Sequence, residues 1–203
     1  MLSINRSRIV LSSILGAVLM LAGCASTGED NTLPQIASEG TRAVEYKSLA
    51  QLAEKANAIV VAVPTGEEYE VPLPEGYGTE DSAPTPYVTM KVLKIISGEV
   101  SGETINVVSP GVDQNTGKQA LASGGPYLLF LAPAMYGAND PAGGYVVVGG
   151  PAGAFESPTR ATSATSFLRI DTASPSLPDQ IDLGKASIPR VTKTEKQLLN
   201  EGP

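Results

Sequence analysis

Histidine and tryptophan are both absent from this 203-residue sequence, and cysteine occurs only once. Without histidine, the chain cannot form a Ser–His–Asp or Cys–His catalytic set, and it lacks the commonest zinc ligand and the side chain that titrates near neutral pH. A single cysteine excludes an intramolecular disulfide. The fold must therefore be stabilised by the packing of its core.

Basic residues are also scarce. The chain has 14 Lys and Arg against 21 Asp and Glu, which gives a formal net charge of −7. No run of basic residues occurs, so the sequence does not favour binding to nucleic acid. An acidic surface also does not attract an anionic membrane, so any contact with a membrane requires another attachment.

The stretch Leu21-Ala22-Gly23-Cys24 separates two segments of different composition. Arg6 and Arg8 precede the apolar run 9–21, whereas polar residues begin soon after Cys24. A basic start, a short apolar core and small residues before a cleavage point are typical of a secretory signal. The stretch resembles the lipobox of bacterial lipoproteins, which implies a diacylglyceryl thioether on Cys24, cleavage before this residue and acyl chains such as palmitate.

Two other interpretations of this segment remain open. The run 9–21 could be a transmembrane helix, although a span needs roughly 20 apolar residues. Cys24 could be an ordinary cysteine, but the only cysteine of the chain stands where the lipobox requires it. Each buried methylene of an acyl chain contributes about 0.8 kcal/mol, so two or more chains hold a protein stably at a membrane.

Three segments follow from this interpretation. Residues 1–23 form a lipoprotein signal peptide, and 24–45 contain the lipidated cysteine and a flexible polar tether. Residues 46–203 form a single β-rich domain with an irregular C-terminal segment. A domain of this size can bury a substantial core.

The domain opens with a short helix and a buried strand. Ser48 and Gln51 have the spacing of a capping box, which predicts a helix over 49–56. The next residues, 58–63, are β-branched or small and apolar in both phases, which predicts a strand covered on both faces. The segment 64–86 is rich in Pro, Gly and Glu and is expected to be a long exposed loop or a loose hairpin.

The segment 87–97 is the clearest strand, but its alternation of apolar and polar residues changes phase at Val92-Leu93. Because the side-chain period of a strand is two, this change predicts a β-bulge. The strand is expected to pair antiparallel with a strand near 104–108. Further strands are predicted at 127–132, 145–148, 154–155 and 167–170, loops at 109–126 and 133–144, an irregular segment at 171–191, and a capping box from Thr192 to Glu195 that opens a helix through Asn200.

This pattern favours a mainly β fold, a small antiparallel barrel or sandwich with two short helices. The bulged strand and the leading helix resemble an OB or netrin-like module. The order of the helix and of the apolar segments 58–63, 92–98 and 127–131 is similar to that of uncharacterised surface lipoproteins of Gram-positive bacteria. This resemblance implies no particular activity.

Few residues suggest chemistry. The sequence contains neither Gly-x-Ser-x-Gly nor Ser-x-x-Lys, so the common serine nucleophile motifs are missing. Pairs of carboxylates could hydrolyse a glycoside without histidine, but no pair is distinguished from the others. Tyr69, Tyr77, Tyr136 and Tyr145 could form a recognition surface, with Tyr136 the best exposed aromatic and Tyr127 and Tyr145 expected to be half-buried.

We therefore expect a lipoprotein attached through Cys24 to the exported side of a cell membrane. It would act as a non-catalytic binding or structural module of the envelope, with no cofactor, no metal and no catalytic residue. Its partners would be the membrane, through the lipid, and an unknown envelope protein or ligand, but not nucleic acid. The alternatives are a small-ligand-binding lipoprotein and a carboxylate-dependent hydrolase.

Overall fold

A computed structural model describes residues 36–37, 44–79 and 82–202. The expected signal segment 1–23, Cys24 and most of the tether lie outside the described residues. In chain order the elements are β1 (Ile36–Ala37), α1 (Leu49–Lys55), β2 (Ala58–Val71), β3 (Thr85–Gly98), β4 (Thr104–Val108), β5 (Val112–Asp113), β6 (Tyr127–Gly137), β7 (Asp140–Val147), the 3-10 helix η1 (Gly150–Gly153), β8 (Ala154–Glu156), β9 (Ser166–Arg169), β10 (Gln180–Asp182) and α2 (Glu195–Glu201).

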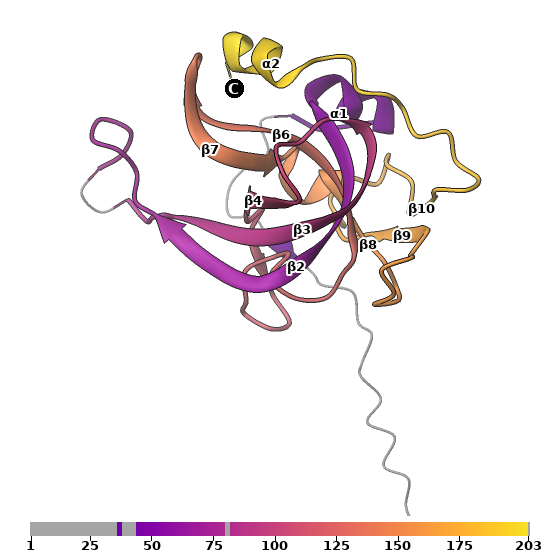
Figure 1. The fold of residues 1–203 in the computed structure, drawn as a ribbon. Coiled ribbons are helices and arrows are strands. Elements are labelled where there is room, and N and C mark those ends of the chain that lie inside the picture. Colours follow the sequence, from indigo (N-terminus) through magenta and orange to yellow (C-terminus); the bar gives the residue numbers. More distant parts are fainter. Residues whose placement is uncertain (1–35, 38–43, 80–81, 203) are drawn as a thin grey trace, which may run out of the picture. The chain divides into compact units, whose positions relative to one another are not determined.

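The main sheet has the strand order β10-β9-β8-β6-β2-β3-β4-β7. Because β7 also pairs with β6, the strands β6, β2, β3, β4 and β7 close into a barrel-like ring (Figure 1). The contact of β4 with β7, at Val107 and Tyr145, is parallel, whereas the other pairings in this sheet are antiparallel. The expected mainly β fold is confirmed, but the sheet is mixed because β7 closes the ring in the same direction as β4.

The first helix forms where its capping residues predict it. The Ser48 hydroxyl accepts a hydrogen bond from Gln51 N at 3.3 Å, and the Gln51 side chain accepts one from Lys47 N at 2.7 Å. These contacts satisfy backbone donors that have no partner within the helix. The helix ends at Lys55, one residue earlier than expected.

The first half of β2 lies between two hydrophobic cores. Ala58, Val60 and Ala62 belong to the core inside the ring, whereas Ile59 and Val61 pack in a second core with α1, β8 and β9. All these side chains are almost completely buried. The expectation that both faces of this strand are covered is confirmed. Burying one such aliphatic side chain contributes about 1.5–3 kcal/mol.

The predicted bulge in β3 is confirmed. Val61 pairs with Lys94 and the next residue, Ala62, pairs with Val92, so Leu93 is the extra residue. A second shift of register leaves out Ile96. β3 pairs antiparallel with β4 from Tyr87 to Lys91, as expected.

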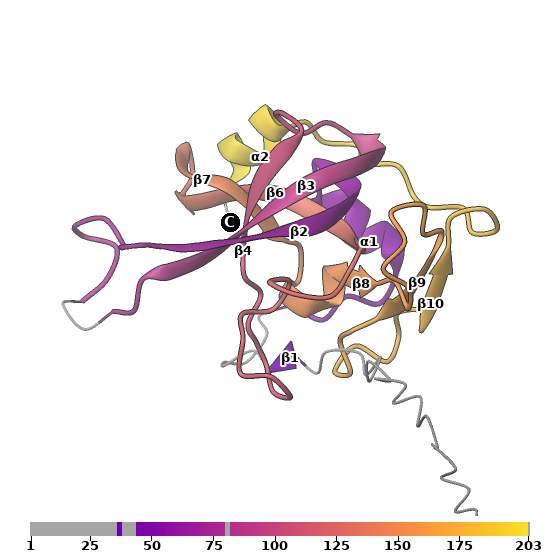
Figure 2. The ribbon, with the colours of Figure 1, turned by 60° about the horizontal axis from the view of Figure 1, so that its bottom comes forward.

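Of the two expectations for 64–86, a long exposed loop or a loose hairpin, the structure shows the hairpin, with strand at 64–71 and 85–86. β2 continues to Val71 and β3 begins at Thr85, so the two strands form a long hairpin that extends away from the ring (Figures 1 and 2). We call residues 63–71 and 85–88 with the tip 72–79 and 82–84 "the arm". Pro64 does not end β2 because it lies at an irregularity of the ladder and at a free edge, where a missing N–H is tolerated.

The prediction of a loop at 133–144 is wrong, because β6 and β7 continue through this segment as a second hairpin. Asn139, with a positive φ of 59°, lies in the turn of this β6–β7 hairpin. Proline is again tolerated, since the pairing of Pro133 is followed by a shift of register. The segment 171–191 is not wholly irregular, because it contains β10.

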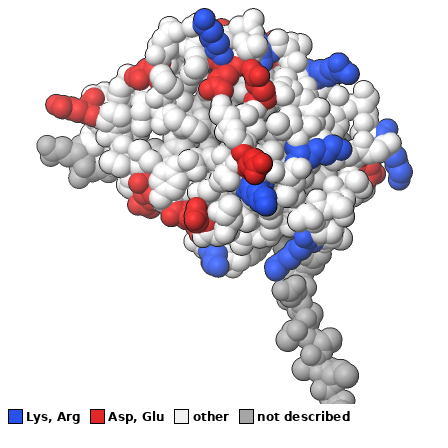
Figure 3. Space-filling model, in the orientation of Figure 1, with Lys and Arg blue, Asp and Glu red and all other residues white. Residues whose placement is uncertain are grey.

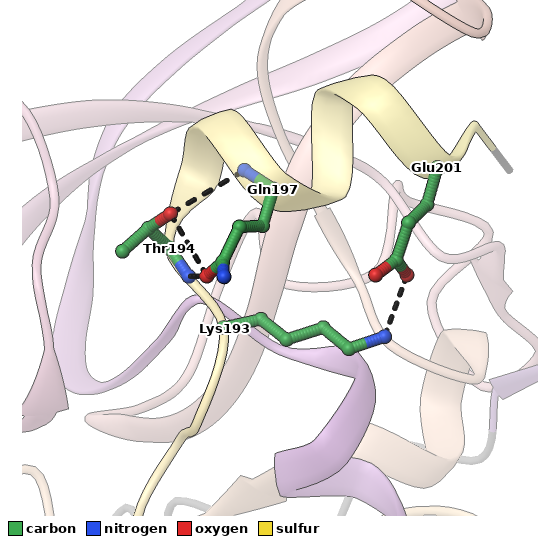
Figure 4. Close-up of polar contacts among 4 residues, drawn as sticks. All are labelled: Lys193, Thr194, Gln197 and Glu201. Carbon is green, nitrogen blue, oxygen red and sulfur yellow. Dashed lines mark hydrogen bonds and ion pairs between the residues drawn. The ribbon is translucent and has the colours of Figure 1, made fainter.

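The C-terminal helix has a capping box two residues later than predicted. Thr194, not Thr192, is the N-cap, and its hydroxyl accepts from Gln197 N at 3.3 Å while Gln197 Oε1 accepts from Thr194 N at 2.8 Å (Figure 4). The prediction paired Thr192 with Glu195, three residues later. A Gln at this spacing completes a capping box as well as a Glu does, and Gln197 stands three residues after Thr194. Lys193 Nζ also lies 2.5 Å from Glu201 Oε2, an exposed ion pair that contributes little to stability.

Candidate functional site

The most distinctive surface of the protein is an aromatic one. It contains Tyr69 of β2, Tyr77 of the arm tip, Tyr87 of β3 and Tyr136 of β6, which we call the tyrosine face. The rings of Tyr69 and Tyr87 are stacked, with centroids 5.4 Å apart and planes 7° apart. Those of Tyr77 and Tyr136 lie 5.1 Å apart at 36°. Residues that are far apart in the sequence therefore meet at one surface.

The stack of Tyr69 on Tyr87 follows directly from strand pairing. The two residues are opposite each other in the β2–β3 ladder, where side chains of a pair stand side by side on one face. Tyr87 is 3% exposed, whereas Tyr69 is 41% exposed. The inner ring therefore supports the outer one, and the outer ring offers its free face to solvent.

Two hydrogen bonds connect the arm to the β6–β7 hairpin. The Tyr77 hydroxyl donates to an oxygen of the Asp140 carboxylate, and the Tyr87 hydroxyl donates to Gly143 O at 3.1 Å. Both acceptors belong to β7. The arm is thus held at its tip and at its base, although its two strands alone would be only marginally stable.

The hydroxyls of Tyr69, Tyr77 and Tyr87 keep their protons. The hydrogen bond to Asp140 and the charge of this carboxylate raise the pKa of Tyr77, and burial raises the pKa of Tyr87. Burial also raises the pKa of Tyr69. Neutral phenols combine an apolar ring with a polar hydroxyl, and this combination suits binding surfaces.

The charges around this face are of one sign. Glu67, Glu68, Glu70 and Glu75 are exposed on the arm, and the sequence 64–87 contains no Lys or Arg. In the view of Figure 3, the end of the molecule where the arm lies shows acidic but no basic side chains. The candidate site is therefore aromatic with an acidic border.

The structure brings together most, but not all, of the tyrosines singled out in the sequence. Tyr69, Tyr77 and Tyr136 lie on the tyrosine face, but Tyr145 is buried in the core of the ring, where its hydroxyl accepts from Ser101 N at 3.1 Å. Tyr145 is therefore not part of the surface and is more deeply buried than the expected half-buried position, because its position in β7 faces inward. The expectation that Tyr136 is the best exposed aromatic is wrong, since it is half-buried whereas Tyr69 and Tyr77 are exposed. Tyr87 was missed, and only its pairing opposite Tyr69 reveals its role. Cys24 lies outside the described residues.

Tyr127 is buried rather than half-buried, and it lies beside a buried carboxyl group. Glu156 is 7% exposed; its Oε1 accepts from Gly125 N at 2.7 Å, and its Oε2 has no hydrogen-bond partner. Burial raises the pKa of Glu156, which the Gly125 N–H and the Tyr127 hydroxyl partly oppose. The Tyr127 hydroxyl donates to Ser123 O at 2.5 Å. These contacts hold the loop that precedes β6 against β8.

A cavity of about 580 Å³ lies on another part of the surface. It is open to solvent and mainly apolar, and it is lined by Tyr46, which precedes α1, and by residues of α1, β6, β7 and α2, among them Lys55, Met135, Val146 and Leu198. Its volume is within the range of small-molecule sites, roughly 300–1,000 Å³. It is the second candidate site.

Two features are absent from residues 36–37, 44–79 and 82–202. In these ranges no group of three or more Cys, Asp or Glu residues is placed to hold a metal ion. No helix in them has the length and apolar character needed to cross a membrane.

In comparisons with known proteins, the chain matches no family model, no curated protein and no solved structure. Its geometry and its sequence are therefore the basis for a functional proposal.

Proposed function

We propose that this protein is a lipid-anchored binding module on the exported side of a bacterial cell membrane, and that the tyrosine face is its recognition surface. The lipobox-like stretch Leu21-Ala22-Gly23-Cys24 supports the anchor. The binding role rests on one observation, the convergence of Tyr69, Tyr77, Tyr87 and Tyr136 on one surface between two hairpins.

Such a surface is suited to binding for a physical reason. Tyrosine offers a large, rigid and amphipathic contact area and loses little conformational entropy when it is bound. Here the rings are also supported before any partner arrives, because Tyr87 supports Tyr69 and Asp140 accepts from Tyr77. A surface ordered in advance loses less entropy on association than a mobile one.

The anchor can be tested by changing Cys24→Ala in the full-length chain. We expect the variant to remain uncleaved or to be released from the membrane, because its acyl chains would be missing. The measurement is the distribution of the protein between membrane and supernatant after an alkaline wash. If variant and parent are processed and distributed alike, the lipoprotein interpretation is wrong.

The recognition surface can be tested at the surface of the cell. We compare full-length protein with a Tyr69→Ala, Tyr77→Ala and Tyr136→Ala variant in proximity crosslinking followed by mass spectrometry. A matched control is Ile95→Ala, which removes an exposed apolar side chain near the other end of β3. We expect saturable crosslinking that the triple variant loses and the control retains. Equal crosslinking by all three proteins would refute the proposal.

A second candidate function is the binding of a small ligand in the cavity of about 580 Å³, which favours an apolar molecule. Binding to the folded state alone would raise the melting temperature by mass action. In a thermal-shift screen with metabolite pools, the parent would then respond and a Val146→Trp variant, with a filled cavity, would not. The triple tyrosine variant would respond like the parent.

A further inference from the structure

The arm has one edge with no strand beside it. β6 covers β2 only from Ala58 to Ala62, because β6 begins at Tyr127, the partner of Ala62. From residue 63 to 71, β2 pairs with β3 on one side, with a break in the ladder at residues 65–67. The described residues provide no strand on the other side. Residues 65–70 are exposed. We call the outer side of residues 65–71 the arm edge.

Such an edge presents unpaired backbone groups. In an antiparallel ladder, successive residues direct their N–H and C=O groups alternately to either side. In the regular part of the arm edge, from Glu68 to Val71, every second residue therefore points these groups outward. An extended chain can satisfy them by adding a strand. Strand addition gives affinity through the backbone, and side-chain contacts then determine which sequence binds.

The charges of the arm edge limit its partners. Glu68 and Glu70 lie in the regular part of the ladder and are exposed, and neither forms an ion pair with another described residue. A second copy of this edge would bring glutamates against glutamates, so like charges disfavour self-pairing. An anionic polymer would be repelled in the same way. A cationic chain is the complementary partner.

The two faces of the arm edge differ. Because side chains alternate along a strand, Glu68 and Glu70 lie on one face and Tyr69 on the other. The stacked pair of Tyr69 and Tyr87 provides an aromatic surface for aliphatic side chains or for the stem of a lysine. Every second side chain of a strand added here would therefore lie against the carboxylates, and the intervening side chains would lie against the tyrosine.

We propose that the arm edge binds an extended peptide segment of an envelope protein by strand addition, and that this segment alternates Lys or Arg with apolar residues. The inference rests on the proposed binding function and specifies the chemistry of its partner. The basic side chains lie against Glu68 and Glu70, and the apolar ones pack beside Tyr69.

The test uses full-length protein in an uncharged detergent and fluorescein-labelled heptapeptides. The probe alternates Lys and Val. The controls are a scrambled peptide of the same composition, the same sequence with Glu in place of Lys, and the same sequence with N-methyl groups on alternate residues, which remove backbone donors. Fluorescence anisotropy should show the alternating Lys–Val peptide binding at least about tenfold more tightly than each control, with an advantage over the Glu peptide that decreases as salt is raised.

Charge reversal gives a second measurement. A Glu68→Lys and Glu70→Lys variant should prefer the Glu–Val peptide to the Lys–Val peptide. A Glu54→Lys and Glu99→Lys variant changes two exposed acidic residues elsewhere and alters the net charge equally, and it should keep the original preference. Circular dichroism of both variants verifies that the fold is intact.

The proposal is overturned if the Lys–Val peptide binds no better than its scrambled or N-methylated form, or if charge reversal on the arm leaves the preference unchanged. These outcomes are independent of the crosslinking experiment. Crosslinking that still depends on the tyrosines would then preserve the binding function and reject only the peptide partner. Conversely, a correct peptide preference without tyrosine-dependent crosslinking would reject the tyrosine face as the recognition surface in the cell.

Discussion

The two halves of β2 follow the same strand geometry but are stabilised in different ways. From Ala58 to Ala62 the strand has a neighbour on each side and a hydrophobic core on each face. From residue 63 to 71 it has one neighbour, exposed glutamates and a stack of two tyrosines. The first half is fixed by burial, whereas the second depends on its ladder with β3 and on two tyrosine hydroxyls. A rigid base thus supports a projecting arm that leaves an edge and a face accessible.

The largest expected difference between the two halves of β2 is the loss of unfolding free energy when a side chain is truncated. Ile59→Ala should reduce the free energy of unfolding by about 2–5 kcal/mol, because it leaves a cavity beneath α1. Glu68→Ala on the arm should change it by less than about 0.5 kcal/mol. Urea denaturation measures both. Similar losses for the two variants would show that the arm belongs to the same cooperative core as the base.

A smaller effect is expected at two glycines with positive φ. Gly98, opposite Ala58, has φ of 74°, and a Cβ there would lie 1.9 Å from Asn57 O. Gly66 in the arm has φ of 89° and open space around it. Gly66→Ala should cost about 1–2 kcal/mol of strain, and Gly98→Ala should cost more, since the backbone must also move. Equal losses of unfolding free energy would contradict the close packing at the base.

The smallest expected effect is the pH dependence of stability that comes from a buried carboxyl group in the base, compared with an exposed one on the arm. The raised pKa of buried Glu156 means that the folded state binds this proton more tightly than the unfolded chain does. The contribution of this group to stability is therefore fully present below pH 4.5, the usual value, and is lost as pH rises through the higher pKa of the folded state.

Glu156→Gln, which stays neutral and keeps an oxygen for the Gly125 N–H, removes this dependence. The difference in unfolding free energy between variant and parent should shift in favour of the variant as pH rises from 4 to 8. Glu70→Gln on the arm is the control for losing one surface charge. If the Glu156→Gln difference does not change with pH relative to this control, the carboxyl group does not experience the burial described above.

Much of the fold could be predicted from local patterns. The apolar character of residues 58–62 in both phases predicted a strand with two covered faces, because each face needs its own apolar set. The change of phase at Val92-Leu93 predicted the bulge for the same geometric reason. Ser48 and Gln51 predicted the first helix, since capping is a contact between residues close in sequence.

The errors also have physical causes. The strands predicted at 58–63 and 127–132 stop just before Pro64 and Pro133. Proline is tolerated in a strand at a free edge or at an irregular pairing, and only the arrangement of neighbouring strands reveals such places. Thr192 and Thr194 are both plausible caps, and the structure selects the second, for which Gln197 completes the box.

The sequence by itself determined the class of fold, the acidic character of 64–87 and the absence of the chemistry that requires histidine. These properties depend on composition and on the order of nearby residues. The tertiary structure decided that the first part of the acidic segment, up to Val71, is a strand with a free edge. It also decided that Tyr69, Tyr77 and Tyr136 share a surface with Tyr87 buried beneath Tyr69, while Tyr145 lies in the core of the ring. The ladder of β2 with β3 forms the stack of Tyr69 on Tyr87. Contacts between more distant parts of the chain bring Tyr77 to Tyr136 and place Tyr145 in the core of the ring that β4 and β7 close.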